Sequence, residues 1–151
     1  MHDILVREWM TAQPIVASPS TTLPEALQLM QTKNIRRLPI CDKDKLVGIV
    51  TKGDLRGAQP SEATSLSIFE LNYLVGRITL GAIMTHDPVC VSPTATIYEA
   101  AQIMLRRKIS GLPVMDDGQL VGIITESDIF RMVVRTWPEQ KSKPEPELHS
   151  A

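Results

Sequence analysis

Residues 46–54 read LVGIVTKGD, and residues 120–128 read LVGIITESD, a near copy of the same stretch. Working outward from this pair, residues 10–54 align with residues 84–128 without a gap, and 20 of the 45 aligned positions are identical. Such a duplication sets the architecture, because two copies of one small unit usually pack against each other through equivalent faces. We therefore expect the functional crevice to lie between the two copies.

The composition is that of an ordinary folded protein. The chain has 151 residues, of which 43% are hydrophobic and 22% charged, with a formal net charge of -1. Nucleic-acid backbones are held by a basic excess, which is missing here, so nucleic-acid binding is not expected. No run reaches the roughly 18 to 20 apolar residues of a membrane span, and residues 1–4 do not resemble the start of a signal peptide. We expect a cytoplasmic protein without a membrane partner.

The two cysteines do not suggest a disulfide framework. Cys41 and Cys90 occupy positions that are not equivalent in the repeat. Free thiols in a reducing compartment are the simpler interpretation.

Each copy begins with the same succession of elements. A Met-Thr pair is followed by an extended run, expected as a strand at residues 15–17 and 89–91. Thr22 and Thr96 then begin a helix, each with a glutamate three residues later that completes a capping box. Apolar residues recur at helical spacing behind both boxes.

Each copy ends with two strands around a polar turn and then a second helix. The expected strands are residues 38–41 and 46–50 in the first copy, and residues 112–115 and 120–124 in the second. The second helix of the second copy is the longer, with Ile129, Met132 and Val133 on one face. Each copy is therefore predicted to be a β-α-β-β-α unit.

A structured connector is expected between the copies. Ser67 and Glu70 form a further capping box, and apolar residues follow at the spacing of an amphipathic helix. The predicted boundaries are a first repeat at 1–62, a helical connector at 63–79, a second repeat at 80–137 and a disordered tail at 138–151. The tail is proline-rich and polar, with little to bury.

The residues that carry chemistry follow the last strand of each copy. Thr51 leaves a buried strand and Asp54 stands three residues later in the first helical turn; Thr125 and Asp128 repeat the arrangement. Helix N-termini attract anions, and a fixed carboxylate can accept both hydrogens of a ribose diol. Taken alone, each Thr-x-x-Asp is also an ordinary helix cap. Its recurrence at the same point of a repeat favours a ribose-phosphate site.

At these motifs the sequence resembles the CBS domain family, as a stand-alone tandem pair, or Bateman module, over residues 5–135. The shared motifs are the Met-Thr-x-x-Pro opening, the (Leu/Ile)-Pro-(Ile/Val) strand and the closing Thr-x-x-Asp, each present twice. The connector at residues 63–74 resembles that of bacterial CBS proteins related to acetoin-utilisation proteins. The resemblance implies an α/β (α+β) fold in which two repeats pack with pseudo-twofold symmetry through their sheets.

The resemblance also implies a function. Such pairs bind adenosine-containing ligands (AMP, ADP, ATP or S-adenosylmethionine) in two clefts between the repeats, require no other cofactor, and commonly form homodimers. By position, the two aspartates would hold the ribose, the two threonines would lie beside ribose or phosphate, and Val16 and Cys90 would flank the base. The expected ligand-binding residues are Val16, Arg36, Arg37, Thr51, Gly53, Asp54, Thr85, Cys90, Ser110, Gly111, Thr125, Ser127 and Asp128.

The two clefts are expected to differ in charge. The first repeat contributes Arg36, Arg37 and Lys52, whereas the second has Ser110 and Gly111 in place of the two arginines, and Glu126 in place of the lysine. Guanidinium groups grip phosphate bidentately. We therefore predict that a phosphate-rich ligand binds where the basic residues of the first repeat reach; a solvated surface pair is the alternative for the two arginines.

Catalysis is not expected, because no metal-ligand spacing, nucleophile-base pair or glycine-rich phosphate loop occurs. The leading interpretation is a non-catalytic sensor, with a ligand-free scaffold for protein-protein interaction as the alternative. We expect the apolar face of Ile129, Met132 and Val133 to be exposed and to supply the homodimer surface.

Overall fold

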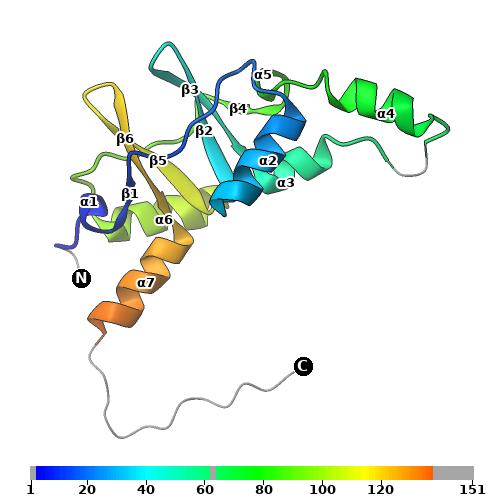
Figure 1. The fold of residues 1–151 in the computed structure, drawn as a ribbon. Helices are drawn as coiled ribbons and strands as arrows, with labels where there is room; N and C mark the ends of the chain where they lie inside the picture. The colour runs from blue at the N-terminus through cyan, green and yellow to red at the C-terminus, as the bar shows by residue number, and fades with distance from the viewer. Residues whose placement is uncertain (1–2, 62–63, 138–151) are drawn as a thin grey trace, which may run out of the picture.

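The computed structural model describes residues 3–61 and 64–137, which form two three-stranded sheets with helices packed around them (Figure 1). The described helices are α1 (Val6–Trp9), α2 (Leu23–Lys33), α3 (Lys52–Gly57), α4 (Ile68–Val75), α5 (Leu80–Ile83), α6 (Ile97–Arg107) and α7 (Glu126–Thr136). The strands are β1 (Thr11–Ala12), β2 (Arg37–Asp42), β3 (Lys45–Thr51), β4 (Thr85–His86), β5 (Gly111–Asp116) and β6 (Gln119–Thr125). The expected α/β class is confirmed.

The two repeats exchange their opening segments. One sheet has the order β1-β6-β5 and the other the order β2-β3-β4, so the first strand of each repeat pairs with the hairpin of the other. Both added strands are antiparallel to their neighbours: Thr11 pairs with Ile123, and Thr85 pairs with Ile49. Strands β3 and β6 also contact each other, which brings the sheets together with pseudo-twofold symmetry.

A glycine in each central strand makes this exchange possible. A Cβ atom at Gly48 would lie 2.5 Å from Met84 Sδ and 2.9 Å from the Thr85 carbonyl oxygen. At Gly122 it would lie 2.5 Å from Met10 Sδ and 2.9 Å from the Thr11 carbonyl oxygen. The glycine and the Met-Thr pair therefore recur together because the methionine of one repeat lies on the glycine of the other.

The described residues form two hydrophobic cores, and each core includes a residue from the opening segment of the other repeat. Val6 is fully buried among residues of the second repeat, including Leu112, Ile124 and Met132. Leu80 is fully buried among residues of the first repeat, including Leu23. The predicted boundaries at residues 62 and 79 stay a prediction, and the predicted tail at 138–151 lies outside the described residues.

The predicted capping boxes and hairpin turns of each repeat are confirmed. Thr22 and Thr96 each accept a hydrogen bond from the glutamate N–H three residues on, and the glutamate carboxylate accepts one from the threonine N–H. Each hairpin turns through two residues with positive φ: Lys43 and Asp44 (49° and 64°), and Asp117 and Gly118 (50° and 78°). Both turns therefore have the mirror-image geometry that matches strand twist.

The runs expected as opening strands are shorter than predicted. Only Ala17 and Val91 form isolated parallel bridges, with Ile40 and Val114 respectively. The regular strands lie earlier, in the Met-Thr segments, because these are the parts that pair with the other repeat.

The prediction that Ile129, Met132 and Val133 form an exposed face of α7 is wrong. Met132 is 2% exposed, and Ile129 and Val133 pack against the same core. Phe130, Val134 and Trp137 are the exposed apolar residues at the C-terminal end, at 64%, 77% and 59%. Their spacing of four and three places them on one face.

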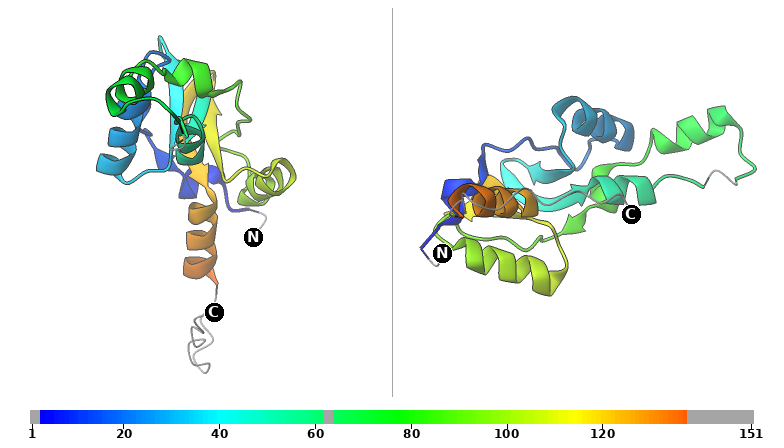
Figure 2. Two further views of the ribbon diagram at one scale, coloured as in Figure 1. Left: turned by 90° about the vertical axis from the view of Figure 1, so that its right-hand side faces the viewer. Right: turned by 90° about the horizontal axis from the view of Figure 1, so that it is seen from below.

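Helix α4 lies in the expected connector and stands away from the sheets (Figure 2). Ser67 accepts a hydrogen bond from the Glu70 N–H at 3.2 Å, so the first half of the predicted capping box forms. Of the helices in residues 3–61 and 64–137, none has the length and apolar character needed to span a membrane.

Candidate functional site

The first candidate turn joins β3 to α3. Thr51 ends the strand in an extended conformation, and its hydroxyl accepts a hydrogen bond from the Asp54 N–H at 3.1 Å. Asp54 Oδ2 accepts a bond from the Thr51 N–H at 2.8 Å. The carboxylate is exposed, and its Oδ1 makes no hydrogen bond to another described residue. The cap therefore fixes the carboxylate and leaves one oxygen for a ligand.

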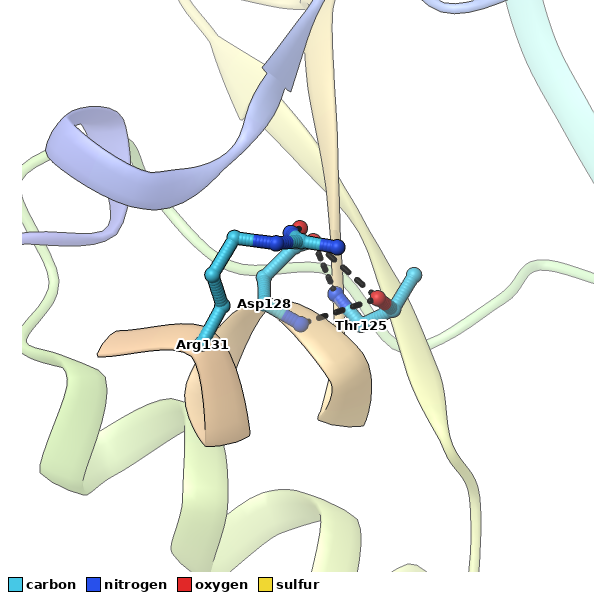
Figure 3. A network of polar contacts seen from close by, with 3 residues as sticks. All are labelled: Thr125, Asp128 and Arg131. Atoms are coloured by element: carbon cyan, nitrogen blue, oxygen red, sulfur yellow. Dashed lines mark hydrogen bonds and ion pairs between the residues drawn. The ribbon is translucent and has the colours of Figure 1, made fainter. Parts of the chain in front are cut away.

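The second turn, from β6 to α7, is similar but more enclosed. Asp128 Oδ2 accepts bonds from the Thr125 N–H at 2.9 Å and from its hydroxyl at 3.1 Å. Asp128 Oδ1 accepts a bond from Arg131 Nη1 at 2.8 Å. Figure 3 shows the Arg131 side chain reaching over the Asp128 carboxylate. Asp128 is only 5% exposed. Both carboxylate oxygens are thus engaged, and Arg131 holds the one that is free at Asp54.

A larger cleft contains Asp128. It has a volume of about 660 Å³, within the range of small-molecule sites. Its lining from the first repeat and its opening segment includes Thr11, Gln13, Pro14, Ile15, Asn34, Ile35, Arg36, Arg37 and Pro39; from the second it includes Ile123, Thr125, Ser127, Asp128 and Arg131. We call it cleft 1. Both repeats are needed to form it.

A smaller cleft of about 290 Å³ contains Asp54. Its lining from the first repeat is Arg37, Ile49, Thr51 and Asp54; from the second it is Thr85, Pro88, Val89, Lys108, Ile109, Ser110, Gly111 and Pro113. We call it cleft 2. In both clefts, the Thr-Asp turn of one repeat faces the extended opening segment of the other.

Arg37 lies between the clefts and lines both. Its Nη2 donates to Ser110 Oγ at 2.6 Å, across the junction of the repeats. Burial lowers the pKa of the Arg37 guanidinium from its ordinary value, and the negative charge of Glu126 opposes that shift. A guanidinium stays protonated in proteins, so the junction carries a permanent positive charge.

Most of the expected residues meet at the clefts, but three do not. Arg36, Arg37, Thr125, Ser127 and Asp128 line cleft 1. Arg37, Thr51, Asp54, Thr85, Ser110 and Gly111 line cleft 2. Val16, Gly53 and Cys90 are in neither lining; Ile15 and Val89 line the clefts beside Val16 and Cys90 because successive residues of an extended segment point to opposite sides.

Two basic residues were missed. Arg131 follows Asp128 by three residues on a helix, a spacing that places both side chains on one face. Lys108 ends α6 in the left-handed conformation (φ 56°) and lines cleft 2, as its repeat equivalent Asn34 (φ 53°) lines cleft 1. Lys108 makes cleft 2 more basic than the sequence predicts, and Arg131 does the same for cleft 1.

The remaining groups that could carry chemistry are clusters of metal ligands and the two thiols. No group of three or more His, Cys, Asp or Glu side chains within residues 3–61 and 64–137 could hold a metal ion. Burial raises the pKa of the Cys90 thiol, whose Sγ donates to the Pro88 carbonyl at 3.2 Å. Burial, with a smaller contribution from Asp44, also raises the pKa of Cys41. Both thiols are therefore poor nucleophiles at neutral pH.

Comparison with known proteins agrees with this geometry. Residues 6–61 and 74–135 match the CBS domain, so the chain belongs to the CBS domain family. It carries two CBS repeats. The two matched ranges leave residues 62–73 between them.

Three solved structures share the fold at a TM-score of 0.72. One, described as an acetoin utilization protein (AcuB) from Vibrio cholerae, is 37% identical and is matched over 87% of this chain and 91% of its own. The CBS domain pair of protein MJ0100, in complex with 5'-methylthioadenosine and S-adenosyl-L-methionine, is 31% identical over 87% and 96%. CBSX2 from Arabidopsis thaliana, in complex with AMP, is 31% identical over 87% and 97%.

Some relatives are much longer proteins. Inosine-5'-monophosphate dehydrogenase from Korarchaeum cryptofilum is 38% identical over 117 residues, which are 77% of this chain but only 21% of that enzyme. The chain therefore spans about a fifth of this relative, and the similarity carries no argument about dehydrogenase activity.

Proposed function

We propose that the protein is a non-catalytic sensor that binds adenosine-containing ligands (AMP, ADP, ATP or S-adenosylmethionine) in clefts 1 and 2. The observation that carries the proposal is the placement of Asp54 and Asp128. Each is fixed by a threonine cap at a helix N-terminus, and each lines a cleft built from both repeats. The complexes of MJ0100 and CBSX2 with adenosine compounds support the same class of ligand.

The ligand would be held by groups of two kinds. An aspartate carboxylate accepts hydrogen bonds from the ribose hydroxyls, while the apolar Ile15 or Val89 of the opposite repeat lies against the base. Basic side chains at the junction receive phosphate. Because three arginines line cleft 1 (Arg36, Arg37 and Arg131), we assign the phosphate-rich ligand to that cleft.

A thermal-shift panel with AMP, ADP, ATP, S-adenosylmethionine and NADH tests the proposal. A ligand at 100 times its dissociation constant adds about 2.7 kcal/mol, which raises the melting temperature of a domain of this size by roughly 5–10 °C. The double variant Asp54→Ala/Asp128→Ala should lose this shift. Glu25→Ala/Glu99→Ala is the matched control, since these glutamates occupy the same capping position but line neither cleft.

The competing function is a ligand-free scaffold that binds other proteins through the same fold. A flat panel, with no shift for any adenosine compound, would favour it over the sensor. Loss of the shift in both double variants would show only that capping matters, and would refute the assignment of the aspartates to ribose.

The phosphate assignment has its own test. Arg36→Ala and Arg37→Ala should each weaken ATP binding, with adenosine affected less, because only the phosphates need the guanidinium groups. Unchanged ATP affinity in both variants would refute the assignment of cleft 1 to phosphate.

We also propose that the protein forms a homodimer in the cytoplasm. Phe130, Val134 and Trp137 form an exposed apolar face on and beside α7, of a kind that association commonly covers. Val134→Glu should shift the protein toward monomer in sedimentation equilibrium, whereas Lys43→Glu at the β2-β3 turn should not. A ligand would then alter the dimer by its differential affinity for two arrangements of the clefts.

A further inference from the structure

The first repeat has an arginine at a position where the second repeat has a glycine. Residues 37 and 111 are equivalent in the duplication, and they meet at the junction of the repeats. A Cβ atom at Gly111 would lie 2.7 Å from Arg37 Cδ and 2.8 Å from its Nε. A side chain at 111 would therefore displace the Arg37 guanidinium from its place at the junction.

The Arg37 side chain is hydrogen-bonded to the wall of cleft 2 and lines both clefts. Its hydrogen bond to Ser110 attaches it to the wall of cleft 2, while the repeat-two acids Glu126 and Asp128 oppose the shift that burial imposes on its pKa. Asp128 belongs to cleft 1. The guanidinium thus lies within the electrostatic reach of both sites. The other cleft-lining arginines and lysine serve one cleft only: Arg36 and Arg131 line cleft 1, and Lys108 lines cleft 2.

We propose that Arg37 is a single cation shared by the two clefts, so that phosphate-bearing ligands compete for it and bind with negative cooperativity. The inference rests on the proposed adenosine-ligand function. The first phosphate to arrive takes the guanidinium fork, because a bidentate contact to an anion is stronger than the bond to the neutral Ser110 hydroxyl. The second phosphate then finds no free cation there and meets the negative charge of the first.

Each cleft keeps some basic charge of its own, so the second ligand binds more weakly and is not excluded. Typical coupling between sites is 5- to 150-fold, and we expect about tenfold here. A ligand without phosphate makes no demand on Arg37. Adenosine should therefore fill the two clefts independently.

Isothermal titration of the full chain with ATP and with adenosine tests the inference. Asp54→Ala leaves cleft 1 as the competent site, and Asp128→Ala leaves cleft 2, so the two variants give the intrinsic affinity of each cleft. The matching asparagine variants replace any alanine variant that fails to fold, since the asparagine side chain can still accept the capping bond. Cooperativity is the departure of the parent isotherm from the sum of the two single-cleft isotherms.

The parent protein should show a second ATP step about tenfold weaker than the sum requires, and no departure with adenosine. Arg37→Gln should abolish the departure, because the neutral amide has no charge to share. Arg36→Gln is the matched control: it should weaken cleft 1 and leave the cooperativity in place. Arg37→Lys, which keeps the charge, should retain part of it.

Three results would overturn the inference. A parent ATP isotherm equal to the sum of the single-cleft isotherms excludes sharing. Cooperativity that persists in Arg37→Gln excludes Arg37 as its source. If neither ATP nor adenosine binds any form, the proposed function and the inference fail together, whereas the first two results leave the function standing.

Discussion

Arg131 donates to Asp128 Oδ1 at 2.8 Å, and the first repeat has no such pair, because Gly57 occupies the position equivalent to Arg131. The two carboxylates are therefore not interchangeable. Under the proposed function, a ribose in cleft 1 would share Asp128 with a cation, whereas a ribose in cleft 2 would meet an Asp54 oxygen that no described residue engages. The same cation lines the cleft that we assign to phosphate.

Arg131→Gln should move the affinities of two ligands in opposite directions. In the Asp54→Ala background, adenosine should bind cleft 1 more tightly because Asp128 is released, and ATP should bind several-fold more weakly because a phosphate partner is lost. Isothermal titration measures both. Arg135→Gln is the control, since Arg135 is exposed on the same helix and lines neither cleft. Parallel changes for the two ligands would contradict this competition.

Gly48→Ala should lower the free energy of unfolding by about 1–3 kcal/mol, the usual cost of overpacking. The added Cβ meets Met84 Sδ at 2.5 Å and the Thr85 carbonyl at 2.9 Å, and the carbonyl cannot move aside without disturbing β4. Urea denaturation gives the value. At Gly57 an added Cβ meets nothing within 4 Å, so Gly57→Ala should be neutral or slightly stabilising. Equal losses at the two positions would show that the close approach is not the cause.

Asp44→Gly should stabilise the protein by roughly 0.5–1 kcal/mol. Asp44 holds φ at 64° in the first hairpin, where the second hairpin has Gly118 at 78°. The reciprocal change, Gly118→Asp, should cost a similar amount because nothing else contacts that position within 4 Å. Thermal or urea denaturation of both variants is sufficient. A stabilising Gly118→Asp would show that turn conformation does not decide the effect.

The two thiols should react more slowly with iodoacetamide in the folded protein than in urea. Burial raises the pKa of both Cys41 and Cys90, so less reactive thiolate is present at a given pH, and the rise in rate should move to higher pH. The same sign makes folding less favourable as pH rises above the pKa of the unfolded thiol. Cys41→Ser and Cys90→Ser separate the two sites. A folded-state rate profile centred at or below that of the unfolded chain would contradict the expectation.

Much of this fold is local and could therefore be predicted. The capping boxes at Thr22 and Thr96, the polar hairpin turns and the Thr-Asp turns depend on residues within a few positions of one another. The location of Asp54 and Asp128 at the junction also follows from the duplication. The structure has each of these features at the residues where the sequence predicts it.

The rest depends on contacts between distant residues. Nothing near Met10 indicates that it packs on Gly122, so the exchange of opening segments was not foreseen. The outward face of α7 was assigned from periodicity alone, and periodicity identifies an apolar face without saying whether the core covers it. Arg131 lies outside the motif that the repeats share, since Gly57 occupies the equivalent position, so the duplication does not predict its role.

The exchanged opening segments have a mechanical consequence. Val6 is buried in the core of the second half, and Leu80 is buried in the core of the first. Unfolding either half would therefore expose a buried side chain that belongs to the other half. We expect one calorimetric transition instead of two. A ligand bound in either cleft should then raise the temperature of this single transition, instead of protecting one half alone.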